Sequence, residues 1–392
     1  QLLLGKTKLA ESAYRQALQT YQQLHEEFPD NQTYPLQAIA IKSELGMLCR
    51  TDGRLLDSVN HHREALEFLD KLSKPIRQTA AARFRRARIY NLLGLPPQRG
   101  SRHESSDPGM AAKMLDNILQ EMGSSRVDLY LQSEHILDKL IRQYPKNANY
   151  RIERVRGLTN MMRVSNRPKI LPDPWILWND AKDIVKQLLA EQPDNANYQY
   201  EFALLFVQKL QPGRKQIPLN KIRGRLEEAI TICDQLYRRY RHVPEYTKLL
   251  AQALYNRAEF EVRYTKLRSE PDRLLMAVKL FRESIDYQQR LASQFPDVLQ
   301  YQIRLNQSSH RLSETYERLG RIEDAQAVLE LNIKEFDLYL DEHPQFEDAR
   351  RILVYDYELL ATLLDRNGQS RFAQVARDKA QKLRDQFADP PN

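Results

Sequence analysis

Apolar residues recur along this chain with the period of an α-helix. Between residues 322 and 340, successive apolar positions are separated by three, four, four, three and four residues, which places them on one stripe of a helix. The segment 10–28 has a similar stripe, with small residues first and an aromatic residue last. The stripes are Ile322, Ala325, Leu329, Ile333, Phe336 and Leu340, and Ala10, Ala13, Ala17, Tyr21, Leu24 and Phe28. The period-two alternation of strands is hard to find, so we predict an all-α chain.

Glycine and proline punctuate this pattern at a constant step. In two series, each of these residues lies 24 positions after the one before it. The first series is Gly5, Pro29 and Gly53, and the second is Pro296, Gly320, Pro344 and Gly368. Because both residue types end helices, the repeating unit is interpreted as a helix, a glycine turn, a second helix and a proline turn. One such helix cannot bury its apolar stripe alone, so neighbouring pairs must stack.

The proline positions divide the chain into modules. We predict a single right-handed superhelical solenoid of about seven antiparallel helix pairs over residues 1–392. The modules are expected at roughly 1–29, 30–75, 76–145, 146–193, 194–244, 245–296, 297–344 and 345–392. The third contains a Pro-, Gly- and Ser-rich insertion at 95–109, which predicts an exposed loop, followed by an extra helix at 110–122.

Composition supports this picture and excludes some alternatives. Hydrophobic residues make up 42% of the chain and charged residues 29%, a balance typical of globular and not of disordered proteins. No apolar run approaches the roughly 20 residues of a membrane-spanning helix, so we expect no membrane insertion. The only cysteines, Cys49 and Cys233, exclude a disulfide framework. Since the chain begins at Gln1 without methionine and shows no targeting segment, we expect a fragment of a longer, cytoplasmic protein.

The spacing of glycine, alanine and proline residues resembles that of a known family of helical repeats. The positions that match the Gly, Ala and Pro of the tetratricopeptide (TPR) signature are Gly5, Ala17 and Pro29. In a later module the aromatic, Leu, Gly and Pro of the signature match Tyr316, Leu319, Gly320 and Pro344, whereas Asn332 replaces its Ala. The modules are longer than a TPR, at about 48 residues against 34. The resemblance is clear in residues 1–29, 30–75 and 297–392.

A second, looser resemblance concerns the setting of such arrays. Long modules with Phe-Pro-Asp and Gly-Arg motifs are similar to helical arrays that follow the catalytic domain of some bacterial serine/threonine protein kinases. The glycine-rich loop, the His-Arg-Asp motif and the Asp-Phe-Gly motif of the kinase itself are absent from this sequence. The resemblance implies a regulatory or scaffolding module of a larger protein.

The TPR resemblance also implies a binding face, because the first helix of each pair lines an inner groove in TPR arrays. Carried onto matching positions, this implies a groove lined by His310, Glu314, Glu317 and Arg321 in one module and by Arg351, Tyr355 and Glu358 in the next. These residues alternate in charge, so they imply no single ligand charge. The tyrosines five residues beyond four of the prolines are interpreted as packing between pairs; they are Tyr34, Tyr150, Tyr198 and Tyr301.

A run of arginines forms another candidate surface. Arg83 and Arg86 share one helix face and are candidates for clamping a carboxylate or phosphate, while Arg85 and Arg88 form a second pair on another face. The alternative, which we favour, is that four charges surround an ordinary solvated helix.

Motifs for catalysis or cofactor binding are missing. The sequence has no Gly-x-Ser-x-Gly elbow, no phosphate-binding glycine loop and no histidines at metal-ligand spacing, so we predict no catalytic, cofactor or metal residues. We predict a non-catalytic scaffold that binds an unidentified protein or peptide through the groove. The net charge of +8 leaves a nucleic-acid-binding repeat protein as the alternative. An enzyme whose site is assembled from distant residues is less favoured.

Overall fold

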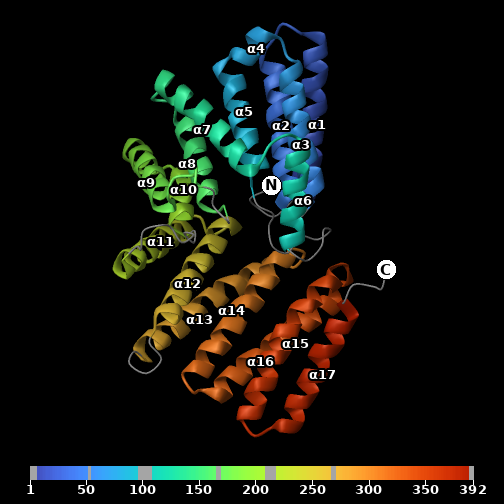
Figure 1. Cartoon of the computed structure of the whole chain (residues 1–392), viewed down its shortest axis with the longest axis vertical. Coiled ribbons are helices and arrows are strands. Elements are labelled where there is room, and N and C mark those ends of the chain that lie inside the picture. The colour runs from blue at the N-terminus through green and yellow to red at the C-terminus, as the bar shows by residue number, and fades with distance from the viewer. Residues whose placement is uncertain are drawn as a thin grey trace. The chain divides into compact units, whose positions relative to one another are not determined.

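The computed structural model describes residues 7–51, 54–95, 108–164, 169–207, 218–265 and 271–387. These residues form helices and their connections, with no strand in those ranges (Figure 1). The chain groups into two compact units, Gln1–Pro218 (unit 1) and Leu219–Asn392 (unit 2).

Unit 1 is built from consecutive helices in which α2 packs on α3, α5 on α7 and α8 on α9 (Figure 1). Two helices interrupt this order: α4 is a single short turn, and α6 follows the predicted loop. The helices are α1 (Thr7–Glu27), α2 (Thr33–Thr51), α3 (Leu55–Lys71), α4 (Lys74–Gln78), α5 (Ala80–Leu93), α6 (Pro108–Glu121), α7 (Arg126–Gln143), α8 (Ala148–Met162), α9 (Pro174–Glu191) and α10 (Ala196–Val207). Most of the insertion at 95–109 lies outside the described residues, but the helix expected at 110–122 is confirmed as α6.

Unit 2 is a regular run of long helices in which each packs on the next (Figure 1). They are α11 (Leu219–Arg239), α12 (Pro244–Tyr264), α13 (Pro271–Gln294), α14 (Leu299–Arg318), α15 (Ile322–Glu342), α16 (Leu353–Arg366) and α17 (Ser370–Phe387), with a 3-10 segment at Pro344–Ile352 before α16. The pairs are α12 with α13, α14 with α15, and α16 with α17.

Glycines close the turns inside the last two pairs of unit 2, as the 24-residue step predicts. Gly320 lies between α14 and α15 with φ of 75°, and Gly368 lies between α16 and α17 with φ of 72°. This left-handed conformation is strained for residues with a side chain, and it lets the chain reverse directly after a helix.

Aromatic pairs mark the turns between successive helix pairs. An aromatic residue at the end of one helix packs on a tyrosine six residues later, at the start of the next. The ring centroids lie 6.2 Å apart in Phe28–Tyr34, 6.1 Å in Tyr144–Tyr150, 5.6 Å in Tyr240–Tyr246 and 6.0 Å in Phe295–Tyr301. The predicted packing role is therefore confirmed for Tyr34, Tyr150 and Tyr301.

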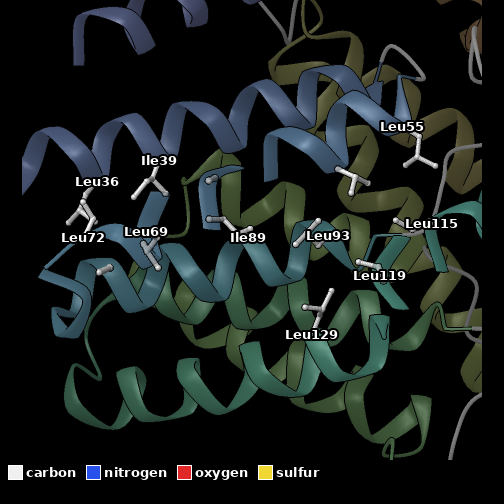
Figure 2. Close-up of a cluster of buried hydrophobic side chains, with 13 residues drawn as sticks. Leu36, Ile39, Leu55, Leu69, Leu72, Ile89, Leu93, Leu115, Leu119 and Leu129 are labelled. Atoms are coloured by element: carbon white, nitrogen blue, oxygen red, sulfur yellow. The ribbon is translucent and has the colours of Figure 1, made fainter. Parts of the chain in front are cut away.

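The core of unit 1 shows why pairs must stack. Figure 2 shows Leu36 and Ile39 of α2, Leu69 of α3 and Leu93 of α5 in one buried cluster. Leu115 and Leu119 of α6 lie in the same cluster and are fully buried. No single helix supplies more than a strip of this core, so the burial that stabilises each helix comes from its neighbours.

The structure confirms an all-α solenoid of TPR-like antiparallel helix pairs. Among the described helices, none is long and apolar enough to cross a membrane. The module boundaries, and their continuation as a single array over residues 1–392, stay predictions.

Candidate interaction surface

The first helices of the pairs in unit 2 are α12, α14 and α16, and polar side chains connect them. We call six residues of these helices, none of them fully buried, the first-helix face. They are Tyr255 and Glu259 of α12, Arg311 and Glu314 of α14, and Tyr355 and Glu358 of α16. All are half-buried except Tyr355, which is 69% exposed. The predicted groove residues lie on or beside this face.

Asp356 is the centre of a buried group of polar contacts near the face, and one of its partners is His310. Asp356 is 1% exposed, and one of its oxygens lies 2.6 Å from Nδ1 of His310. Its other oxygen accepts hydrogen bonds from the amides of Asn306, at 2.6 Å, and Asn332, at 3.3 Å. The carboxylate therefore ties α16 to both helices of the preceding pair.

His310 is held in its charged form by two carboxylates. Its Nε2 lies 3.6 Å from Glu314, opposite the contact with Asp356. Burial favours the neutral ring, but the hydrogen bonds and charges of Asp356 and Glu314 outweigh it and raise the pKa of His310 to about 9. His310 is thus an imidazolium that donates from Nδ1 to Asp356 and forms an ion pair with Glu314, which suits a structural cross-link better than proton transfer near neutral pH.

Arg311 makes the corresponding connection from α14 back to α12. Its Nε donates to Glu259 over 2.5 Å, and a terminal nitrogen contacts Glu314. Burial opposes ionisation of Glu314, yet His310 and Arg311 together hold its pKa below the usual range. The charges of three successive first helices are therefore coupled along one row.

The other predicted groove residues divide into two groups. Glu317 pairs with Arg366 of α16 at 2.7 Å, so it also joins two first helices. Arg321 instead lies at the turn into α15, where it pairs with Asp324 at 2.7 Å and covers the ring of Tyr316. Glu358 contacts Arg384 of α17. Arg351 is half-buried in the 3-10 segment before α16.

The residues that hold the row together do not stand out in the repeat pattern. Asp356, Arg311 and Glu259 match no position of the predicted groove, although they contact His310 or Glu314 directly or through one another. One signal was available for Asp356: it is an acid at a core position of the apolar segment Leu353–Leu360. A buried position filled by an acid predicts a partner on another helix.

The structure directs Arg83 and Arg86 to two different helices. Arg86 pairs with Asp70 of α3 at 2.5 Å, whereas Arg83 donates to the side-chain amide of Gln143 of α7 at 3.0 Å. On the other face of α5, Arg88 pairs with Glu44 of α2. Burial and the nearby charge of Arg88 lower the pKa of Arg85.

First helices in unit 1 are connected in the same manner as those in unit 2. Asn91 of α5 donates to the carboxylate of Glu153 of α8 over 2.8 Å. Arg156 of α8 contacts Glu201 of α10 at 2.6 Å and Glu153 at 3.5 Å. Burial raises the pKa of Glu201, against the opposing effect of Arg156. Polar contacts between first helices are thus a general device of this chain.

The described residues offer little that suits a small ligand. None of them form a group of three His, Cys, Asp or Glu side chains that could hold a metal ion. A hollow of about 500 Å³ lies on α13, and all the residues that line it come from that one helix: Asp286, Gln289, Arg290, Ser293 and Gln294. Such a lining describes an open surface, not an enclosed pocket of the kind that small ligands occupy.

Charge is distributed unequally between the units. Residues 1–218 contain 32 Lys and Arg against 24 Asp and Glu, whereas residues 219–392 contain 28 of each. The whole net charge of +8 therefore belongs to unit 1.

Comparison with protein-family models and with curated proteins finds no match. Solved structures give distant likenesses. The TPR domain of P58(IPK) is 15% identical, with 99% of this chain and 98% of that chain covered and a TM-score of 0.24. A monomeric mutant of IFIT1 with the capped oligonucleotide m7Gppp-AAAA is 11% identical, covers 88% and 90%, and has a TM-score of 0.31. The human IFIT1 dimer with the same oligonucleotide is 12% identical, covers 88% and 90%, and has a TM-score of 0.22. At these scores the assignment of the fold rests on the helices and turns of this chain.

Proposed function

We propose that this chain is a non-catalytic scaffold that binds a protein or peptide segment across the first-helix face of unit 2. The observation that carries the proposal is the exposure of Tyr355. A tyrosine presents a large apolar ring with a polar tip, and such residues dominate the binding energy of many interfaces. At 69% exposure, Tyr355 has most of its ring free to be buried by a partner.

The charged row around Tyr355 supports the same proposal. Arg311 and Glu358 pair with charged residues of neighbouring helices, and Glu314 pairs with Arg311 and His310 of its own helix. The three side chains therefore hold fixed positions and can orient a partner without a large loss of side-chain entropy. Their signs alternate, which favours a partner segment of mixed charge. In this proposal the charged residues select the register of the segment, and Tyr355 supplies the anchor.

We also propose that the scaffold belongs to a larger protein and regulates or positions a catalytic domain, a protein kinase being the concrete candidate. The support for this setting is the resemblance of the repeat motifs to arrays found beside bacterial kinases. A recombinant kinase domain from the same longer protein, mixed with this chain, provides the direct test of whether the two interact.

The experiment that tests the binding face compares two exposed aromatic residues of unit 2. The chain is used to capture partners from its source lysate, and the captured protein is then titrated, in purified form, against Tyr355→Ala and Phe372→Ala. Phe372 is 63% exposed on α17 and lies outside the first-helix face, so it is a matched control. We expect Tyr355→Ala to weaken binding at least tenfold and Phe372→Ala less than twofold. Equal effects of the two substitutions would contradict the proposed face.

A further inference from the structure

Two stretches of unit 1 contain basic residues and no acidic ones. Neither residues 71–95 nor residues 139–152 include an Asp or a Glu. The first stretch contains Lys71, Lys74, Arg77, Arg83, Arg85, Arg86 and Arg88, and the second contains Lys139, Arg142, Lys146 and Arg151. The sequence separates these stretches by more than 40 residues, so their combined effect depends on the fold.

Helix α5 brings the two stretches together. Arg86 contacts Asp70, the residue before Lys71, and Arg83 contacts Gln143, the residue after Arg142. The ends of α3 and α7 therefore both lie against α5, and α4 leads directly into α5. We call the exposed cations at these helix ends the basic edge: Lys71, Lys74, Arg77, Arg142 and Lys146, all of which are exposed.

The charge of the basic edge is hardly neutralised. Of its five cations, only Arg142 has an acidic partner in the described part of the chain, Asp138 in its own helix at 3.0 Å. That pair is solvent-exposed and therefore weak. Four cations thus remain available, and their mutual repulsion favours the approach of a polyanion. Because all five are exposed, they suit an extended ligand better than a small phosphate compound, which needs a pocket.

An aromatic platform stands within the basic edge. Tyr144, between Arg142 and Lys146, is 41% exposed. Its ring meets that of Tyr150 at 6.1 Å, and Tyr150 in turn packs on Phe84 of α5 at 5.1 Å. Tyr144 is therefore supported from behind while part of its ring faces solvent. Cations that follow a phosphate backbone, together with an aromatic ring on which a base can stack, are what single-stranded nucleic acids require.

We infer that the basic edge of unit 1 binds single-stranded nucleic acid, with its lysines and arginines on phosphates and Tyr144 against a base. An acidic protein segment would use the same charges but would have no need of the exposed ring. This surface is separate from the first-helix face of unit 2, so either proposal can hold without the other.

The test measures fluorescence anisotropy of labelled oligouridylate and oligothymidylate with the full chain, over salt concentrations from about 50 to 200 mM. One variant combines Lys71→Ala, Lys74→Ala and Arg77→Ala. A matched control combines Lys334→Ala, Arg371→Ala and Lys382→Ala, three exposed cations of unit 2. Both variants lose three positive charges, so they differ only in where the charges are removed. Circular dichroism confirms that both remain folded.

We expect the basic-edge variant to weaken binding at least tenfold and the control less than threefold. The association constant K falls as the salt concentration rises. Losing three phosphate contacts should make the slope of log K against log salt concentration less steep by about 2, since each contact to a single strand contributes about 0.7. Tyr144→Ala should weaken binding about threefold or more without changing that slope. Equal weakening by the two triple variants would overturn the inference, as would competition by polyglutamate as effective as that by unlabelled oligonucleotide. Unchanged binding by Tyr355→Ala separates this surface from the proposed protein-binding face.

Discussion

Units 1 and 2 are built from helix pairs of the same kind, yet they differ in net charge. Unit 1 carries the entire net charge of +8, and unit 2 is neutral. The contrast extends to one histidine in each unit. His62 of α3 is fully buried against Gly46, and neither ring nitrogen has a hydrogen-bond partner within the described ranges. His310 of α14 lies between two carboxylates.

The consequence is that one histidine is neutral and the other is charged. Burial, with the nearby positive charges of Arg50 and Arg88, lowers the pKa of His62 to about 3. In unit 2, Asp356 and Glu314 overcome burial and raise the pKa of His310 to about 9. The comparison teaches that burial alone does not determine the ionisation of a histidine. The charges on the neighbouring helices decide whether a buried ring is a packing group or a cross-link.

The largest effect is expected from Asp356→Ala in unit 2. Removal of this carboxylate leaves His310 charged and leaves two buried amides without their acceptor, so we expect the free energy of unfolding to fall by about 3–5 kcal/mol. Both tryptophans, Trp175 and Trp178, lie in unit 1. Urea denaturation followed by circular dichroism should therefore show the loss while the tryptophan fluorescence transition stays in place. A shift of the fluorescence transition alone would contradict this assignment.

The pH dependence of the two units should run in opposite directions. The unfolded chain protonates histidine near the ordinary pKa of 6.5. Because folded His62 resists protonation, unit 1 should lose stability as the pH falls from 6.5 towards 3. Because folded His310 keeps its proton, unit 2 should lose stability as the pH rises from 6.5 to 9, by about 3 kcal/mol. Denaturation at several pH values, read by tryptophan fluorescence for unit 1 and by circular dichroism for both, measures each slope.

Two variants isolate the histidines from other titrating groups. His62→Phe keeps a flat ring against Gly46 and should remove part of the acid-side loss in unit 1. His310→Gln should flatten the alkaline side of unit 2 and leave unit 1 unchanged. An unaltered pH profile for either variant would show that carboxylates, and not the histidine, cause that slope.

The substitution Gly46→Ala tests how tightly the backbone at Gly46 packs against His62. A Cβ atom there would lie 2.6–2.9 Å from three ring atoms of His62, and overpacking of this kind costs about 1–3 kcal/mol. We expect Gly46→Ala to shift the tryptophan fluorescence transition to lower urea. Adding His62→Ala makes room for the methyl group, so the double variant should lose less than the sum of the two single losses.

The smallest effect concerns the glycine turns of unit 2. Gly320 has φ of 75° and nothing within 4 Å of a Cβ atom, so Gly320→Ala should cost about 1 kcal/mol through backbone strain alone. Gly224 has equally open surroundings but lies within helix α11. Gly224→Ala should therefore stabilise unit 2 by about 0.5–1 kcal/mol. Equal effects of the two substitutions on the circular dichroism transition would refute the role given to the turn.

The sequence by itself determined the helices, their turns and their pairing rule. Apolar stripes, glycines that favour a left-handed turn and prolines that end helices act within a few residues, so Gly320, Pro344 and Gly368 could be interpreted without any fold. The same holds for Tyr34, Tyr150 and Tyr301, whose aromatic partners lie six residues away.

Only the tertiary structure decided which charges are neutralised and which remain exposed. Asp356 meets Asn306 across 50 residues of sequence, and Arg311 meets Glu259 across 52. Arg83 and Arg86, which look like one clamp on a helical wheel, contact different helices. Electrostatic interactions depend on distance in space and on burial, and neither is encoded in local spacing. For that reason the basic edge and the charged row of the first helices became visible only once the helices were packed.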